Sequence, residues 1–182
     1  MKNIYLENGM ANEKIAAIEK LLESLGKRIS SARPIEEVAR EILVTLAQGL
    51  SCEWATFWIV DRSILRPICT WSDPNVNSWD LTLDTRHRTL SVYDGTAGHV
   101  WKTRVPLWST DILKDMCLPR STMSERAGIH GGIWFPIVAN KKVYGVVEVL
   151  GRDFPPAEPV VLDKLEKFGF EIGMFLERLL PH

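Results

Sequence analysis

Three cysteines, Cys52, Cys69 and Cys117, are the side chains of this chain best suited to covalent or redox chemistry. Redox chemistry needs a thiol with a lowered pKa and a resolving partner, and metal binding needs ligands at close spacing. The three cysteines are far apart in the sequence, and no Cys-x-x-Cys pair occurs. We therefore expect neither a zinc site nor a disulfide framework, but the reduced thiols of a cytoplasmic protein.

Aromatic and acidic side chains indicate ligand binding instead. Most of the seven tryptophans are expected in the core, because each buries a large area. The others would line a pocket for a planar or apolar ligand, with carboxylates supplying its few polar contacts. Glu148 stands among valines in mid-strand, where the alternative is a solvent-facing or ion-paired carboxylate. The candidate ligand-binding residues from these classes are Phe57, Trp71, Trp101, Asp111, Trp134 and Glu148.

No set of residues in the sequence has the spacing of a known catalytic or metal site. His87, His99 and His130 are scattered over loops and short helices, where surface or packing roles are expected. We find no phosphate-binding loop, no paired catalytic carboxylates and no Ser–His motif. We therefore predict no catalytic residue and no metal ligand, and a protein that is not an enzyme.

Composition excludes several classes of partner. The chain has 182 residues, enough for one domain with flanking helices, with 22 Lys and Arg against 23 Asp and Glu. A net charge of −1 gives no electrostatic basis for binding nucleic acid or an anionic membrane. No apolar run is long enough for a membrane span, and the first residues do not resemble a signal peptide.

Helices with heptad spacing are predicted at both ends of the chain, at 13–31 and 159–180, after a flexible segment at 1–12. The two seams could pack on each other within one chain, or form a parallel bundle across a two-fold axis. We expect the second arrangement, a homodimer, because each seam alone is too short for a robust coiled coil. The predicted dimerisation residues are Ile15, Ile18, Leu22, Leu25 and Ile29 in the first helix, and Leu165, Phe168, Ile172, Phe175 and Leu179 in the second.

Between these helices the pattern predicts an α+β domain with an antiparallel sheet. A helix from Pro34 to about Gly49 has the wide apolar face of a helix on a sheet. The first strand is apolar on both faces, so both faces of the sheet should be covered. Pro67 indicates an edge strand or a bulge. The expected strands are 52–60, 64–71, 132–139 and 143–150, with short helices at 95–102 and 121–127, an extended piece at 105–108, and a loop with one short strand at 72–92.

Two segments within this order resemble the GAF domain family. They are GTAGHVWKTRVPLWSTDI at 95–112 and LPRSTMSERAGIHGGIWFPIVANKKVYGVVEVL at 118–150. The resemblance covers about 34–180, with 34–158 as the GAF core. It implies a central antiparallel sheet with the terminal helices on one face, and with short helices and loops enclosing a small-molecule pocket on the other.

The resemblance also implies a function. GAF domains are sensory modules of signalling proteins such as sensor histidine kinases, and they relay ligand state to an output domain such as a histidine kinase or cyclase, in the same or a partner chain. Members bind cyclic nucleotides, bilins, haem, 2-oxo acids or nothing, so the resemblance names no ligand. The alternative is a dimerisation scaffold with a filled pocket, which bulky side chains between sheet and loops would favour.

This sequence departs from the pattern of two specialised branches of the family. Bilin-binding members carry a linking cysteine after the Asp of their Trp-x-x-Asp segment, which makes Cys117 a further candidate site residue, but Leu118 replaces the usual histidine. Free-methionine-sulfoxide reductases carry a thiol in the glycine-rich segment, where this chain has Gly98, His99 and Val100. Neither bilin, haem nor reductase activity is therefore expected.

Overall fold

An antiparallel sheet of five strands, in the order β2–β1–β5–β4–β3, forms the middle layer of the structure. The computed structural model describes residues 20, 23–24, 33–115, 121–154, 156 and 159–179. The predicted segment 1–12, the five heptad residues predicted between Ile15 and Ile29, and Cys117 lie outside these ranges. The strands are β1 (Trp54–Asp61), β2 (Ile64–Ser72), β3 (Leu107–Ser109), β4 (Gly131–Ala139) and β5 (Lys142–Gly151).

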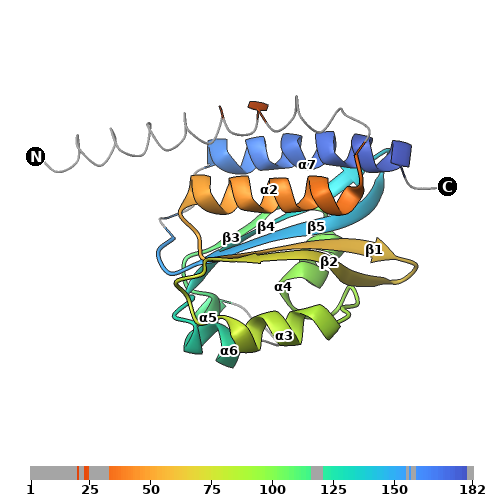
Figure 1. Cartoon of the computed structure of the whole chain (residues 1–182). Helices are drawn as coiled ribbons and strands as arrows, with labels where there is room; N and C mark the ends of the chain where they lie inside the picture. Colours follow the sequence, from red (N-terminus) through yellow and green to blue (C-terminus); the bar gives the residue numbers. More distant parts are fainter. Residues whose placement is uncertain are drawn as a thin grey trace, which may run out of the picture.

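Two long helices, α2 (Ile35–Leu50) and α7 (Pro159–Leu179), lie side by side on one face of the sheet (Figure 1). We call this face the helix-side face. The predicted wide apolar stripe of α2 is confirmed, because its buried residues recur every three or four positions. They are Val38, Ala39, Ile42, Leu43, Leu46 and Ala47.

Four short helices cover the opposite face, which we call the loop-side face (Figure 1). They are α3 (Trp79–His87), α4 (Gly95–Thr103), α5 (Ile112–Asp115) and α6 (Ser121–Arg126). The α+β fold with a sheet covered on both sides is therefore as predicted. No helix of the described part of the chain is both long and apolar enough to cross a membrane.

The β1–β2 hairpin confirms the prediction from Pro67 of an edge strand or a bulge. β2 is an outer strand of the sheet. Its register with β1 shifts between Phe57, which pairs with Cys69, and Trp58, which pairs with Pro67, so Ile68 is the extra residue of a bulge. Proline has no N–H to donate to a neighbouring strand, and an edge or a bulge is where a sheet tolerates it.

The sequence pattern did not predict two short helices. α3 occupies part of 72–92, where a loop with one short strand is predicted, and α5 begins in a region also read as loop. In α3 only Leu81 and Thr85 are buried. Because the helix rests on the sheet at so few points, its sequence carries almost no apolar periodicity. The predicted short strand is reduced to an isolated bridge between Leu65 and Leu90.

The heptad seam of α7 packs on the chain's own sheet. Four of the five residues predicted there for dimerisation are buried in the helix-side core. They are Leu165, Phe168, Ile172 and Phe175, whereas Leu179 is exposed. The four side chains therefore pack within one chain. The sequence could not show this, because a helix on a sheet and a helix in a coiled coil both bury residues three and four apart.

Candidate functional site

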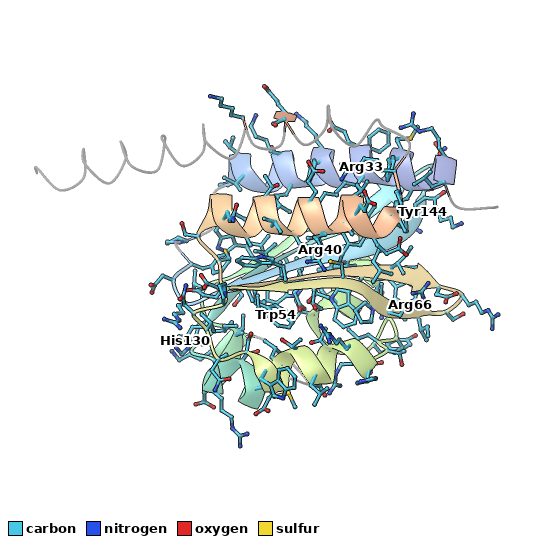
Figure 2. The ribbon with its side chains drawn as sticks, in the orientation of Figure 1. Arg33, Arg40, Trp54, Arg66, His130 and Tyr144 are labelled. Carbon is cyan, nitrogen blue, oxygen red and sulfur yellow. The ribbon has the colours of Figure 1, made fainter. Side chains whose placement is uncertain are left out.

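A row of side chains crosses the middle of the loop-side face. Thr56 on β1 pairs with Glu148 on β5, and Glu148 pairs with Trp134 on β4. Alternate residues of a strand share a face. Trp54, Trp58 and Trp134 belong to the loop-side core, so Thr56 and Glu148 face the same layer. Figure 2 shows Trp54 between the sheet and the short helices.

Two tryptophan indoles donate hydrogen bonds within this row. Trp134 Nε1–H donates to Glu148 Oε2 at 2.8 Å, and Trp54 Nε1–H donates to Thr56 Oγ1 at 3.0 Å. Trp134, Glu148 and Thr56 are completely buried. Removing a carboxyl group from water is costly, and a hydrogen bond from a buried donor offsets only part of that cost. Glu148 is therefore a polar group whose burial in this layer is costly.

The helices above the row also bury polar groups. Thr96 on α4 and Ser124 on α6 are each about 1% exposed. Among the described residues, neither hydroxyl has a hydrogen-bond partner. A buried hydroxyl without a partner costs about 1–3 kcal/mol. Two such groups in the helices that cover the loop-side face indicate that this layer is built for more than apolar packing.

The predicted ligand-binding residues are divided between the two faces. Trp134 and Glu148 are in contact, and half-buried Trp101 packs on the same loop-side core. Phe57 and Trp71 belong to the helix-side core, so the structure does not bring them to Trp134 and Glu148.

Asp111 lies apart from the Glu148 row, at the start of α5. It forms an ion pair with Lys114 at 2.6 Å. Its backbone N–H donates to Ser109 Oγ at 3.2 Å. These contacts hold Asp111 as a local turn residue.

The sequence reading missed two members of the row, Trp54 and Thr56. The signal was present in the first strand, where Trp54, Thr56 and Trp58 alternate with Ala55 and Phe57. A polar residue between two tryptophans on one face is an unusual pattern for an apolar core. It became informative only once the pairing of Thr56 with Glu148 was known.

Replacing Trp134 by phenylalanine is expected to destabilise the domain by about 2–4 kcal/mol, through loss of the donor to a buried carboxyl group and of part of a buried ring. Urea unfolding followed by circular dichroism measures the change. Trp79→Phe is the matched control, because Trp79 is 69% exposed and the same change there should stay within about 0.5 kcal/mol. Equal effects of the two changes would show that the indole–carboxyl bond contributes nothing.

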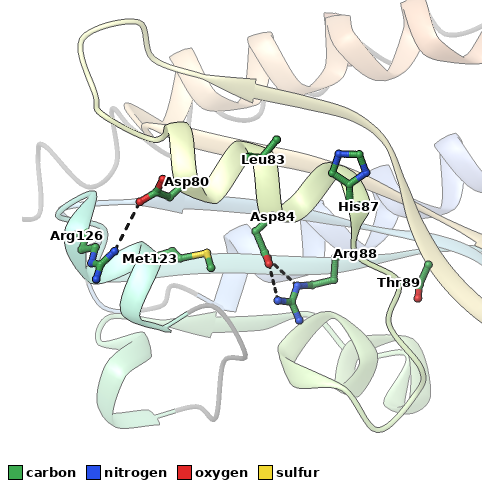
Figure 3. A pocket seen from close by; sticks show the side chains of 8 residues that line it. All are labelled: Asp80, Leu83, Asp84, His87, Arg88, Thr89, Met123 and Arg126. Carbon is green, nitrogen blue, oxygen red and sulfur yellow. Dashed lines mark hydrogen bonds and ion pairs between the residues drawn. The ribbon is translucent and has the colours of Figure 1, made fainter.

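An open groove lies on the outer surface between α3 and α6 (Figure 3). Its volume is about 660 Å³, and its lining residues are Asp80, Leu83, Asp84, His87, Arg88, Thr89, Met123 and Arg126. Arg88 donates two hydrogen bonds of 2.7 Å to Asp84. Arg126 lies 3.7 Å from Asp80. The charges of the groove are thus paired with one another, and none of the predicted site residues that the structure describes lines it.

The two described cysteines lie on the helix-side face. Cys52 is buried and Cys69 is half-buried, and burial raises the pKa of both thiols. Cys69 pairs with Phe57, five residues along the chain from Cys52, which separates the two thiols by about 15 Å. A disulfide needs Cα atoms within about 7 Å. Cys52 and Cys69 are free cysteines in the structure.

Alkylation of both thiols at pH 7.5 is expected to be slower than that of free cysteine, because a raised pKa leaves less thiolate. Cys52 should react at least tenfold more slowly than Cys69, since it is also the more buried. Mass spectrometry of peptides after timed iodoacetamide treatment gives both rates. Labelling of Cys52 as fast as that of denatured protein would contradict this picture.

The comparison with protein families decides the identity of the fold. The model of the GAF domain matches residues 32–177. The chain belongs to the GAF domain family. GAF domains are typically regulatory or sensory parts of signalling proteins, and the resemblance seen in the sequence is thereby confirmed. A search of curated proteins found no match.

Solved structures of low sequence identity share the fold. The GAF domain of A. aeolicus nlh2, in an inactive state, has a TM-score of 0.74 at 19% identity, with 91% of this chain and 99% of that chain covered. The GAF domain of a Coxiella burnetii phosphoenolpyruvate-protein phosphotransferase has 0.73 at 16%, with 90% and 95% covered. A free methionine-R-sulfoxide reductase from Neisseria meningitidis, in complex with its substrate, has 0.72 at 13%, with 90% of each covered. An enzyme thus stands among the neighbours, so fold alone does not separate regulatory from catalytic members.

Proposed function

We propose that this chain is the small-molecule-sensing domain of a cytoplasmic signalling protein. It dimerises through its terminal helices and relays the state of a ligand to an output domain or partner. The ligand would carry a hydrogen-bond donor for Glu148 and a flat or apolar part for the tryptophans around it.

The observation that carries the proposal is the buried pair of Glu148 and Trp134 on the loop-side face. Well-packed apolar residues in place of a buried charged group are often neutral or stabilising. A carboxyl group here is therefore poorly explained by stability alone. It is well explained by recognition of a polar ligand, because buried sites of this kind combine aromatic walls with few polar groups.

A route from this site to α7 runs through strand β4. Trp134 points to the loop-side layer, and the backbone carbonyl groups of Pro136 and Val138, further along the same strand, lie against α7 on the other side of the sheet. The approach is so close that a methyl group added at Gly169 would lie 2.2 Å from the Pro136 carbonyl oxygen. A ligand that displaces Trp134 would move β4, and α7 would follow, because rigid packed elements transmit such shifts.

Dimerisation would use the outer face of α7 rather than its buried seam. Phe170 is 52% exposed, and exposed Met174 follows it one turn later on the same face. Large apolar side chains exposed together mark an interaction surface. The partner surface would be the same face of a second copy, together with the helix predicted at 13–31.

Changing Phe170 to aspartate is therefore expected to weaken self-association at least tenfold without unfolding the domain. Analytical ultracentrifugation over a range of protein concentrations measures the dissociation constant. Tyr93→Asp is the matched control, because Tyr93 is an 81% exposed aromatic residue on the far side of the sheet. A wild-type chain that stays monomeric at every concentration would contradict the dimer.

The sensing proposal is tested by native mass spectrometry of protein purified from its own host. A discrete additional mass that is lost on denaturation is expected for the wild type, with lower occupancy in Glu148→Gln. Gln retains the size of the side chain but accepts hydrogen bonds less strongly than a carboxylate. An additional mass retained equally in Glu148→Gln would place the ligand elsewhere.

A ligand-free dimerisation scaffold is the second candidate, and a specific observation favours it. Trp54, Trp58 and Trp134 are fully buried on the loop-side face and occupy space that a ligand would need. The same experiment separates the two functions. A dimer at the bare polypeptide mass supports the scaffold, and a dimer with a bound small molecule supports the sensor.

We do not propose that the chain itself catalyses a reaction. A reductase of the kind seen among the structural neighbours would need a reactive thiol and a resolving thiol close together. Cys52 and Cys69 are far apart, and burial raises the pKa of each. The position of the two thiols under the long helices also separates them from the Glu148 row.

A further inference from the structure

A small cavity lies at the edge of the sheet, between the two layers of helices. Its volume is about 180 Å³, and its lining comes from α2, β2 and α3: Arg40, Pro67, Ile68, Cys69, Thr70 and Arg86. The helices that carry the two arginines, α2 and α3, cover opposite faces of the sheet (Figure 1). Figure 2 shows Arg40 between α2 and the sheet.

Within the part of the chain that the structure describes, the lining includes two cations and no acid. Among the described residues, neither Arg40 nor Arg86 forms an ion pair. Two cations that share one small cavity repel each other, and an anion between them replaces that repulsion by two attractions. The charge of the cavity therefore favours binding of a negatively charged ligand.

Most acidic neighbours of both arginines are engaged elsewhere, and the exception is exposed Glu36, one turn before Arg40 on α2. On α2, Glu37 and Glu41 both pair with Arg33, at 3.5 and 2.5 Å. On α3, Asp84 holds Arg88 with two hydrogen bonds of 2.7 Å. Arg40 and Arg86 are exposed side chains that line the cavity, and these pairs engage three of the neighbouring carboxylates with other arginines.

The strand between the arginines adds neutral donors. β2 is an outer strand, so alternate N–H groups point away from β1. Leu90 covers part of this edge, with hydrogen bonds of 2.7 and 3.0 Å to Leu65. The cavity begins beyond that bridge, at the bulge next to Pro67, where the half-buried hydroxyl of Thr70 is also available.

We propose that this cavity binds a small oxyanion of the phosphate type, held by Arg40 and Arg86 from two sides of the sheet edge. Its volume equals the share of about six water molecules, below the roughly 300 Å³ at which pockets for drug-sized ligands begin. This size suits a phosphate group. Guanidinium groups suit this geometry, because they bind phosphate oxygens through paired N–H donors.

Cys69 gives the site a local reporter. Burial raises the pKa of its thiol, and the nearby Arg40 guanidinium partly opposes that effect. An anion bound at Arg40 would cancel the influence of the cation and cover the sulfur, so the thiol would react more slowly. The cavity adjoins the Glu148 row, because its lining residue Thr70 pairs with Thr56, but its test does not depend on the sensory proposal.

The experiment compares inorganic phosphate with chloride at equal ionic strength. Phosphate is expected to raise the Tm of the wild-type chain in a saturable way and to slow iodoacetamide labelling of Cys69 several-fold, as read from its peptide. Arg40→Gln and Arg86→Gln should each weaken the apparent affinity at least tenfold, because each removes a charge-assisted contact. Arg178→Gln is the matched control, since exposed Arg178 lies in the last turn of α7.

Each outcome bears on the proposal. Loss of both responses in the two cavity variants, with both retained in Arg178→Gln, supports the site. Equal responses in all four proteins, or none in the wild type, would overturn it. Glycerol 3-phosphate in a second series distinguishes the sources: tighter binding than inorganic phosphate indicates a phosphomonoester, and weaker binding indicates the free ion.

Discussion

Replacing Leu165 by aspartate is expected to unfold the domain. Leu165 is fully buried in the helix-side core between α7 and the sheet. Truncation of a buried leucine alone costs about 2–5 kcal/mol, and an unpaired buried carboxylate adds several more. Because domains are stable by only about 5–15 kcal/mol, the total removes most or all of the folding free energy. Far-UV circular dichroism and urea unfolding measure the result.

The matched comparison is Phe170→Asp on the same helix. Phe170 faces outward, so this variant should retain the wild-type spectrum and unfold within about 1 kcal/mol of the wild type. The pair therefore separates folding from association. A folded, monomeric Leu165→Asp protein beside a dimeric wild type would show instead that the seam lies at a subunit interface.

This pair of variants also shows where the sequence was ambiguous. The spacing of Leu165, Phe168 and Ile172 correctly predicted a helix with one apolar stripe. It could not tell which surface the stripe covers, because a sheet and a second helix both accept residues three and four apart. Contacts with β4, which come from a distant part of the chain, decide the question.

The same limit applied to the candidate site. The family, the antiparallel sheet and the bulge at Pro67 could all be predicted, since local patterns and turn residues specify them. Which residues meet across strands could not, because register depends on pairing between distant segments. Glu148 was recognised as unusual, but its partners Trp134 and Thr56 became identifiable only from the register of β4, β5 and β1.

The local sequence specifies the β4–β5 turn but not the short helix α3. Asn140 and Lys141 both adopt left-handed backbone angles, with φ of 46° and 65°. These angles form the tight β4–β5 turn, and asparagine is a local signal for such a turn, because it adopts left-handed angles readily. α3, by contrast, buries only Leu81 and Thr85, so its position depends on the sheet beneath it. No local pattern could have placed it.

Replacing Gly169 by alanine tests the packing of α7 on β4, and the expected change is opposite in sign to helix propensity. In an exposed helix the change would stabilise by about 1 kcal/mol, because glycine is the more flexible residue. Here a Cβ atom would lie 2.2 Å from the carbonyl oxygen of Pro136, about 1 Å inside ordinary carbon–oxygen contact. Gly173 lies equally close to β4, with a Cβ position 2.5 Å from the Val138 carbonyl oxygen. The helix therefore cannot tilt away from β4 at Gly169 without also moving at Gly173.

The backbone of β4 has little freedom to yield, because β4 pairs with β5 from Gly131 to Ala139, with one shift of register between Ile137 and Val138. α7 must therefore move outward and loosen the core around Phe168 and Ile172. Overpacking of this kind costs about 1–3 kcal/mol and sometimes more, so we expect a net loss of about 2–3 kcal/mol and a fall in Tm of about 5–10 °C. Glu171→Ala, two residues further along and exposed, should leave Tm nearly unchanged. A rise in Tm for Gly169→Ala would mean that α7 does not rest on β4 and that β4 cannot couple Trp134 to the helix.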